Sequence, residues 1–330
     1  MIKGYLGSDL PKRHTIFLVA SHVDGPKFVK LVKALSGLLE TLFYLLLKGV
    51  DIVHIHGGDI ISFKRKFYYI KIAKFLKCKI IYHHHGADFM SQYDSLSQKW
   101  KNRIKTTFEQ VDLLICLSHT WRENIRRISP TARVEVIPNC IKLPLHVQKE
   151  FKCRVQLAFL GLIGDRKGVF DLLKVIKMLI DDGCDIRLKI AGNGEVMRLN
   201  KKIDELNIVN EVEYCGWISN EERDLMLRET DIFVLPSYAE GMPMSILEAM
   251  AYSVPVVSTF VGGIPELVLD GKSGLLFKPG DLNEMYHKIK YLIENENIRK
   301  DMGGQGRELI RTHYSIQQIT QKLNAIYNEL

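Results

Sequence analysis

Short apolar runs rich in β-branched residues alternate along this chain with longer amphipathic segments. Near-continuous apolarity is typical of strands covered on both faces, and therefore of parallel sheets joined by helices. The pattern predicts an α/β fold with two Rossmann-like domains that face a cleft. The predicted strands lie at 15–20, 51–56, 79–85, 112–118 and 134–138, and then at 155–161, 185–192, 212–216, 231–237, 254–259 and 273–277.

A segment without hydrophobic periodicity, 137–153, separates the two sets of strands. It holds two prolines and residues of mixed polarity, which is typical of a linker. We therefore expect a first domain over 1–145 and a second domain that begins at 146. Ligands of such sheets bind outside the carboxyl ends of the strands, so functional residues are expected directly after strands.

The beginning of the chain predicts a helix and a loop before the run at 15–20. A Rossmann-like domain usually begins with a strand and a glycine-rich turn, so we expect the first sheet to lack its N-terminal strand. The longest apolar stretch, 35–50, is interrupted by Glu40 and Lys48 and is too short to span a bilayer. It predicts a buried or half-buried helix, with a helix on a membrane surface as the alternative.

The composition is that of a globular protein. Of 330 residues, 46% are apolar and 25% are charged, which excludes disorder, collagen and a coiled coil. The length favours two domains over one. None of the six cysteines forms a C-x-x-C pair, and Cys116 stands inside an apolar run, so we expect reduced thiols in a cytoplasmic protein.

The positive charge is concentrated in the first half. Residues 1–150 carry 24 Lys and Arg against 12 Asp and Glu, whereas 151–330 carry 22 against 26. The first half therefore suits an anionic partner, or it is a solvated basic surface. Its most basic segment, 62–79, is typical of an amphipathic helix, so no nucleic-acid partner is expected.

The segment 236–257 carries two glutamates after a strand. Glu240 falls in the loop, and Glu248 falls two turns into a helix that begins after Pro243. The free amides of Met244 and Ser245 suit a diphosphate, and a carboxylate suits vicinal sugar hydroxyls. The alternative is a capping carboxylate and a solvated helical glutamate.

A cationic turn follows the strand at 155–161. Gly161 ends the strand, Arg166 and Lys167 stand in the loop, and Gly168 opens a helix. Lys167 suits phosphate oxygens, but no Ser or Thr follows it, so the turn is not a P-loop. The alternative is a solvated basic turn.

Three further glycine-containing turns follow strands. The turn at 261–266 suits a phosphate or a sugar, while Gly192 and the Trp217–Ile218 pair fall in loops that suit a nucleobase. Each of these signals is weak by itself.

Histidines follow two strands of the first half. His54 and His56 share a strand face, and a triplet ends at His85. No acidic or cysteine partner stands beside them at ligand spacing, so no metal is expected. We expect His85 to contact a substrate hydroxyl and the other histidines to be packed or at the surface.

These motifs together resemble a known family. The stretch EGMPMSILE resembles the E-x7-E pattern of the family 4 retaining glycosyltransferases, which have the GT-B fold. RKG, GGIPE and SGLLFKPGD are similar to that family in order and spacing, over most of 155–281. VDIVHIHG and HHHGADF resemble N-domain segments of bacterial members that build surface polysaccharides.

The resemblance implies transfer of a hexosyl group, with retention, from a nucleotide sugar to a lipid-linked glycan or a saccharide. The donor would be a UDP-sugar, with a GDP-sugar as the alternative. Glu240, Lys167 and His85 are the implied catalytic residues. The implied donor-binding residues are Gly161, Arg166, Lys167, Gly192, Trp217, Ile218, Glu240, Met242, Met244, Ser245 and Glu248.

The same resemblance assigns roles to individual groups. Lys167 would face the diphosphate, Glu248 the ribose hydroxyls, and Glu240 the transferred sugar or its leaving phosphate. No cofactor and no metal are implied, because cationic groups stabilise the leaving group. The helix at 314–330 would cross back to the first domain, which leaves 146–313 as the donor domain.

This chain departs from the family at two places. The family commonly has Gly-Arg after the first strand of the second domain, whereas this chain has Gly161-Leu162. Either Arg166 substitutes for that arginine or the donor affinity is lower. Relatives also begin with a strand and a Gly-Gly loop before a segment like IKGYLGSDL, where this chain starts.

The implied location is cytoplasmic and peripheral, on the inner face of the cell membrane, with anionic lipid as the partner of the basic half. Three other functions stay open at this point. They are a nucleotide-sugar epimerase of the GT-B fold, a glycoside hydrolase that uses Glu240 and Glu248, and a basic nucleic-acid-binding protein.

Overall fold

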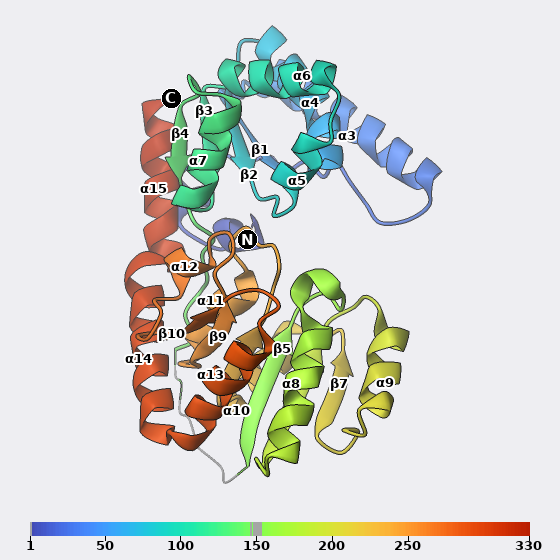
Figure 1. The fold of residues 1–330 in the computed structure, drawn as a ribbon. Helices are drawn as coiled ribbons and strands as arrows, with labels where there is room; N and C mark the ends of the chain where they lie inside the picture. The colour runs from blue at the N-terminus through green and yellow to red at the C-terminus, as the bar shows by residue number, and fades with distance from the viewer. Residues whose placement is uncertain (1, 146, 148–153) are drawn as a thin grey trace. The chain divides into compact units, whose positions relative to one another are not determined.

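The computed structural model describes residues 2–145, 147 and 154–330. The chain divides into two compact units, each an α/β unit with a parallel sheet (Figure 1). The first unit comprises Met1–Pro138 and Ile319–Leu330, and the second comprises Asn139–Gln318. Residues 146 and 148–153 of the expected linker lie outside the described residues.

The first unit has a four-stranded parallel sheet in the order β1-β2-β3-β4. Helices pack on both of its faces (Figure 1). The strands are β1 (Ile52–Gly57), β2 (Lys79–His84), β3 (Leu113–Cys116) and β4 (Val134–Val136); the helices are α1 (Ile2–Leu6), α2 (Leu10–Arg13), α3 (Lys27–Leu47), α4 (Ile60–Phe75), α5 (Phe89–Asp94), α6 (Gln98–Gln110), α7 (His119–Ile128) and α15 (Ile316–Glu329).

The strand predicted at 15–20 is wrong. This segment belongs to no strand, and Leu18 within it is 56% exposed. Among the described residues β1 pairs only with β2, so 15–20 does not extend the sheet at its free edge. An apolar β-branched run forms a strand only where a neighbour accepts its backbone hydrogen bonds, and this run has none.

The two faces of this sheet bury different side chains. On one face Tyr82 of β2 packs against Phe63 and Phe108, with ring centroids 5.9 and 5.6 Å away, respectively. These aromatic rings form the centre of the hydrophobic core. The opposite face carries His54 and His56 of β1 and His83 of β2, because residues two apart on a strand point to the same side.

Helix α3 buries one narrow line of small residues. Only Gly37 and Thr41 are buried among its 21 residues, whereas Phe28 and Leu39 are 74% and 69% exposed. A Cβ atom at Gly37 would lie 2.6 Å from the hydroxyl of Tyr69 on α4, so the small residues set the close approach. The expected burial therefore holds for one side only, and the bulky apolar side chains face outward.

No helix among the described residues combines the length and the apolar character that a transmembrane span needs.

The C-terminal helix α15 completes the first unit. The hydroxyl of Tyr327 lies 2.6 Å from Nδ1 of His54, and Arg133 donates to Glu329 over 2.7 Å. Oδ1 of Asn324 accepts from Nε2 of His14 over 2.9 Å. These bonds fasten the end of the chain to segments almost 200 or more positions earlier.

The second unit has a six-stranded parallel sheet in the order β10-β9-β8-β5-β6-β7. Each of its strands overlaps a run that the sequence predicts. The strands are β5 (Val155–Leu160), β6 (Ile186–Ala191), β7 (Val212–Gly216), β8 (Ile232–Leu235), β9 (Val256–Thr259) and β10 (Gly274–Phe277); the helices are the 3₁₀ turn η1 (Asp165–Lys167), α8 (Val169–Asp181), α9 (Val196–Glu205), α10 (Asn220–Glu229), α11 (Met244–Ala251), α12 (Ile264–Leu267), α13 (Leu282–Glu294) and α14 (Glu296–His313).

The strand order of the second sheet reverses between β5 and β8. From β5 the chain proceeds outward through β6 and β7, then returns to β8 on the other side of β5 and proceeds through β9 and β10. In open parallel sheets such a reversal leaves a crevice at the carboxyl ends of the two central strands. The loops after β5 and β8 therefore lie beside each other.

Gly168 fixes the start of α8 against the end of β8. Its φ is +70°, and a Cβ atom there would lie 2.1 Å from the carbonyl oxygen of Pro236. Only glycine fits both the left-handed backbone and this approach.

Alanine at this glycine is expected to destabilise the chain strongly. Gly183 follows α8 at φ +81°, and a Cβ atom there would have nothing within 4 Å. Gly183→Ala therefore measures only the cost of a left-handed backbone at a residue with a side chain. We expect Gly183→Ala to lower the free energy of unfolding by about 1 kcal/mol. Gly168→Ala should lower it by about 2 kcal/mol more, because the new methyl group meets backbone. Urea denaturation of both variants measures the difference, and equal losses would contradict the close contact.

The buried histidines should make the chain sensitive to acid. Burial lowers the pKa of His56 to about 4 and that of His84 to about 4, below the ordinary 6.5. The unfolded chain therefore binds more protons between these values, and stability is lost as the pH falls through this window. His56→Gln should reduce the drop in unfolding free energy between about pH 7 and about pH 5, whereas His287→Gln, at an exposed position, should not.

Candidate functional site

Two loops meet at the reversal of the second sheet. The backbone N–H of Tyr238 donates to the carbonyl oxygen of Arg166 over 2.8 Å. The Arg166 guanidinium donates to the carbonyl oxygen of Ala239 over 3.0 Å. The loop after β5 and the loop after β8 are therefore joined by hydrogen bonds in both directions, and Arg166 lies at their junction.

A buried ion pair lies between these loops. Nζ of Lys167 contacts Oε1 of Glu240, and the two side chains are only 13% and 6% exposed. The hydroxyl of Ser237 donates to the same carboxylate oxygen over 2.7 Å. Removing two charges from water is costly, so each of these groups depends on its partner for stabilisation. The pair therefore holds an ammonium group and a carboxylate together between the loops that follow β5 and β8.

The glycine turn at 261–266 supports the loop that carries Glu240. A Cβ atom at Gly262 would lie 1.9 Å from the carbonyl oxygen of Glu240, and φ there is +55°. The N–H of Gly263 donates to the carbonyl oxygen of Gly241 over 2.8 Å. This turn, which the sequence predicts to face a phosphate or a sugar, therefore also packs against the loop that carries Glu240.

Glu248 has a different cationic partner. Nη1 of Arg223, on α10, donates to its Oε1 over 2.8 Å. The side chain of Glu248 is 15% exposed. Burial raises the pKa of Glu248 above its ordinary value, although the nearby charge of Arg223 acts to lower the pKa. The second glutamate of the motif is therefore held beside a guanidinium, with one carboxylate oxygen left over for another donor.

The N-terminus of α11 lies between the two glutamates in sequence. Pro243 precedes the helix, and the first amides, those of Met244 and Ser245, have no partner within the helix. Their side chains are half-buried. Met242 is buried, and its carbonyl oxygen accepts from Asn139 over 2.7 Å. Only the helix amides of this stretch are therefore directed away from the fold.

The other residues that are predicted to bind the donor lie at the carboxyl ends of β5, β6 and β7. Gly161 donates from its N–H to Ala191 over 3.0 Å, and Gly192 donates to Gly216 over 2.8 Å. These bonds tie together the ends of β5, β6 and β7. Trp217 follows β7 and is 77% exposed, and Ile218 beside it is half-buried. An exposed indole on a rigid strand end offers a flat surface for an aromatic ligand.

A cavity of about 800 Å³ lies beside this site. It adjoins Arg166 and the start of α8, but neither Lys167 nor Glu240 lines it. Its Arg198 is already bound by Asp165 and Glu195, each over 2.8 Å. The cavity is therefore adjacent to the loop junction and is not the crevice that the glutamates define.

His85 belongs to the first unit. It follows β2, is half-buried, and its Nε2 lies 2.8 Å from Nδ1 of His56. Burial lowers the pKa of His85 well below its ordinary value, with the neighbouring histidines acting in the same direction. The ring is therefore a neutral donor or acceptor, and its contact with a substrate hydroxyl stays a prediction.

Sequence reasoning missed three residues of this site. Ser237 ends the strand three positions before Glu240, and its position was a usable signal. Arg223 and Asn139 gave no such signal, because each reaches its partner only through the packing of separate elements. The ion pair of Lys167 with Glu240 was not expected either, although both residues were.

The chain matches two described families. Residues 146–309 match the family described as "Glycosyl transferases group 1", and residues 7–143 match the one described as "Glycosyltransferase Family 4". The two matches cover nearly all of the described residues. They assign the two units to the two halves of one kind of enzyme.

Curated relatives agree with this assignment. The chain is 29% identical over 289 residues to "Uncharacterized glycosyltransferase MJ1178" of Methanocaldococcus jannaschii, which covers 86% of this chain and 78% of that protein. It is 25% identical over 264 residues to "Putative colanic acid biosynthesis glycosyltransferase WcaL" of Salmonella typhimurium, which covers 76% of this chain and 64% of that protein.

A solved structure shares the fold. Anabaena Alr3699/HepE, crystallised in complex with UDP-glucose, superposes with a TM-score of 0.78 at 18% identity. The match covers 97% of this chain and 88% of that one. The two parallel α/β units, the reversed second sheet and the two family matches agree with one another, and this chain belongs to the family 4 glycosyltransferases of the GT-B fold.

Proposed function

We propose that this enzyme transfers a hexosyl group from a UDP-sugar, with retention of the anomeric configuration, to a glycan or lipid-linked glycan during synthesis of a surface polysaccharide. The buried pair of Lys167 and Glu240 at the sheet reversal carries the proposal, together with the second carboxylate of Glu248. The name of the colanic acid relative supports the polysaccharide assignment, and the UDP-glucose complex of HepE supports the donor.

Cationic groups stabilise the leaving diphosphate. In the reaction the bond from the sugar's C1 to the diphosphate oxygen breaks, and an acceptor hydroxyl oxygen bonds C1 from the same face. The acceptor's proton passes to the departing phosphate. Lys167, Arg166 and the amides of Met244 and Ser245 supply positive charge where negative charge develops. These fixed groups make a divalent metal unnecessary for this step.

The nucleoside is held along the rest of the sheet edge. A carboxylate accepts two hydroxyl hydrogen bonds well, so Glu248 binds the ribose while Arg223 keeps it ionised. Trp217 and Ile218, with the backbone at Gly161 and Gly192, hold the uracil. Met242 supports this stretch from the buried side through its bond with Asn139.

The transferred sugar is held by Glu240. When the diphosphate arrives it competes for Lys167, which frees a carboxylate oxygen of Glu240 for sugar hydroxyls. Ser237 keeps the carboxylate oriented during this exchange.

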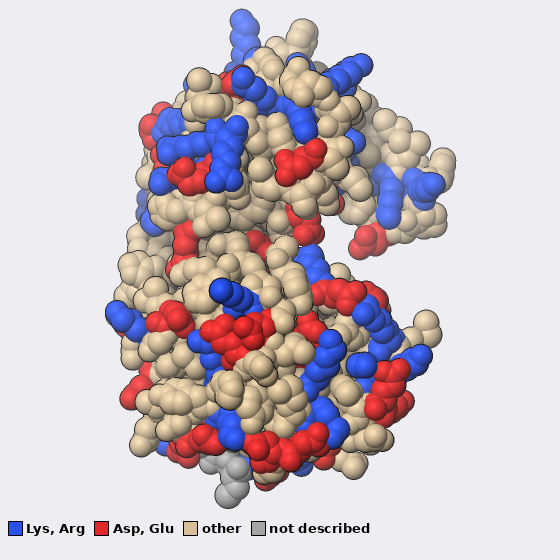
Figure 2. All heavy atoms as spheres, in the orientation of Figure 1, with Lys and Arg blue, Asp and Glu red and all other residues tan. Residues whose placement is uncertain are grey.

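An anionic membrane surface is the partner of the first unit. Helix α3 presents Phe28, Leu35 and Leu39 on its exposed side, and Lys27 and Lys30 at its beginning. Figure 2 shows the Lys and Arg side chains beside uncharged surface in this region. Apolar side chains that insert at an interface, flanked by lysines that meet lipid phosphates, are typical of helices that lie on membranes.

The other candidate functions are not favoured. A hydrolase needs two carboxylates on either side of one bond, yet Glu240 and Glu248 each bind a separate cation. The family matches contain no nucleic-acid module. An epimerase would convert the donor without an acceptor, and the assay below distinguishes it.

The two glutamates should affect different kinetic constants. Glu248→Gln is expected to weaken UDP binding about 10-fold or more, because the ribose loses a charged acceptor. Glu240→Gln is expected to lower the turnover of UDP-sugar about 100-fold with a smaller change in UDP affinity, because the charge acts on the sugar step. Calorimetry with UDP and transfer of radiolabelled sugar to membrane extract measure the two effects.

Glu221→Gln, an exposed change on α10, is the matched control and should change neither constant. Equal UDP affinity of the wild type and Glu248→Gln would show that the donor lies elsewhere. Consumption of UDP-sugar without any acceptor would replace transfer by epimerisation.

Binding to vesicles should depend on α3. We expect the chain to sediment with vesicles that contain phosphatidylglycerol and not with purely zwitterionic vesicles. Leu35→Gln with Leu39→Gln should reduce the bound fraction several-fold, because the apolar side chains no longer insert. Met197→Gln with Val209→Gln changes two apolar side chains of the second unit that are 89% and 63% exposed, and should leave binding intact. Equal losses in both double variants would contradict the role of α3.

A further inference from the structure

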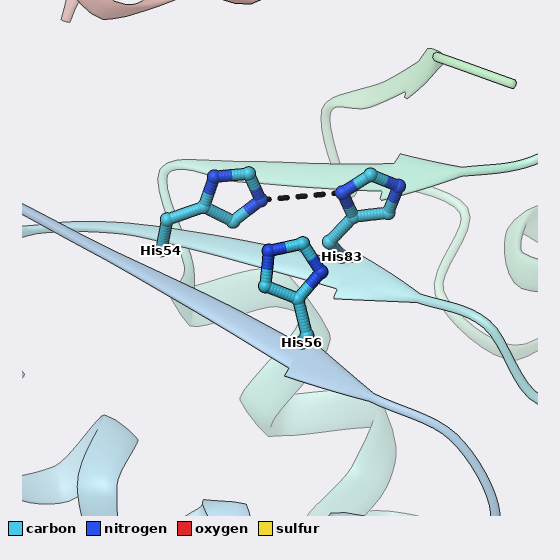
Figure 3. Close-up of side chains that lie close together, drawn as sticks. All are labelled: His54, His56 and His83. Atoms are coloured by element: carbon cyan, nitrogen blue, oxygen red, sulfur yellow. Dashed lines mark hydrogen bonds between the residues drawn. The ribbon is translucent and has the colours of Figure 1, made fainter. Parts of the chain in front are cut away.

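Four histidine rings cover one face of the first sheet beside α15. His54 and His56 lie on β1, and His56 is in register with His83 on β2. His85 follows two positions later and points to the same side. The rings pack face to face, with centroids 4.2–5.1 Å apart for the neighbouring pairs. Figure 3 shows three of them converging above the two strands.

The ring nitrogens of three histidines come close together. His54, His56 and His83 each offer one nitrogen, and these three atoms lie within 4.8 Å of one another. Nε2 of His54 is 3.2 Å from Nδ1 of His83 (Figure 3). Two nitrogens that bind one tetrahedral zinc ion are separated by roughly 3.3 Å, given Zn–N distances of about 2.0–2.1 Å. The spacing of this first pair already fits a metal.

The second nitrogens of two rings are bound on the outside of the cluster. The Tyr327 hydroxyl lies 2.6 Å from Nδ1 of His54, and Nε2 of His85 lies 2.8 Å from Nδ1 of His56. Histidine ligands of metals are usually oriented by such a bond to their other nitrogen. The nitrogens that face inward are therefore Nε2 of His54, which already contacts Nδ1 of His83, and Nε2 of His56.

The cluster is poorly satisfied by its own hydrogen bonds. His83 is fully buried, and its Nε2 has no hydrogen-bond partner among the described residues. In the bond between His54 and His83 one neutral ring donates its N–H and the other accepts with its lone pair, which fixes the tautomers of both rings. Burying imidazoles in this state costs free energy that apolar side chains would not.

We propose that His54, His56 and His83 form a binding site for a divalent transition-metal ion, with Zn²⁺ the best fit. Neutral imidazoles suit zinc, copper, nickel and cobalt, and a site without carboxylates disfavours Mg²⁺ and Ca²⁺. Three protein ligands leave a fourth position for water.

The ion would link β1 to β2 and, through Tyr327, to α15. It lies in the first unit and serves no step of the sugar transfer proposed above, which relies on cationic groups of the second unit. Metal binding is therefore testable without a donor or an acceptor.

Cobalt provides the direct test, because four-coordinate Co²⁺ has intense visible absorption. We expect untagged full-length chain to bind one Co²⁺ per molecule with a tetrahedral spectrum, and one equivalent of Zn²⁺ to displace it. His54→Gln and His83→Gln should each abolish the spectrum. Tyr327→Phe, which keeps the ring and its packing, should weaken binding about 10-fold, because the ligand loses its orienting bond.

His287→Gln removes an exposed histidine of the second unit and should leave the spectrum unchanged. Circular dichroism and the unfolding midpoint identify any variant that fails to fold, and for those the Tyr327→Phe result decides. Absence of a tetrahedral cobalt spectrum in the wild type, or equal affinity in Tyr327→Phe and the wild type, would overturn the site.

Discussion

The reversal of strand order between β5 and β8 is the constraint on which the donor site depends. Because these two strands pair in parallel, their carboxyl ends share one edge, and the loops that follow them are neighbours although Lys167 and Glu240 are 73 positions apart. The buried ion pair is stable only if both loops are in place, and the bonds between Arg166 and the 238–239 backbone hold them there. Fold and charge placement are thus coupled in this unit.

The two units bury polar groups by opposite means. The second unit holds its carboxylates beside cations, as Glu240 with Lys167 and Glu248 with Arg223. Such charges are fixed before a ligand binds, which suits stabilisation of a departing diphosphate. The first unit instead buries neutral histidines, whose pKa values burial lowers. Neutral nitrogens with lone pairs suit hydrogen bonding and metal coordination.

Local sequence signals located the functional residues because strand ends are readable. Lys167, Glu240 and Glu248 follow predicted strands, and the structure places them at the carboxyl edge of one sheet. The same signals failed where a pattern depended on a distant neighbour. The run at 15–20 has strand composition, but no described strand pairs with it. Composition indicates which element a segment can form, whereas pairing with a neighbouring strand decides whether a strand forms.

The sequence by itself determined the α/β class, the parallel sheets, the family and the side chains that carry charge, because hydrophobic period and residue type are local properties. The tertiary structure decided which charges meet: Glu240 with Lys167, Glu248 with Arg223, and three histidine rings from two strands. It also decided that α3 keeps most of its apolar side chains outward. Strand order and register bring these groups together, and neither is encoded in the periodicity of any one segment.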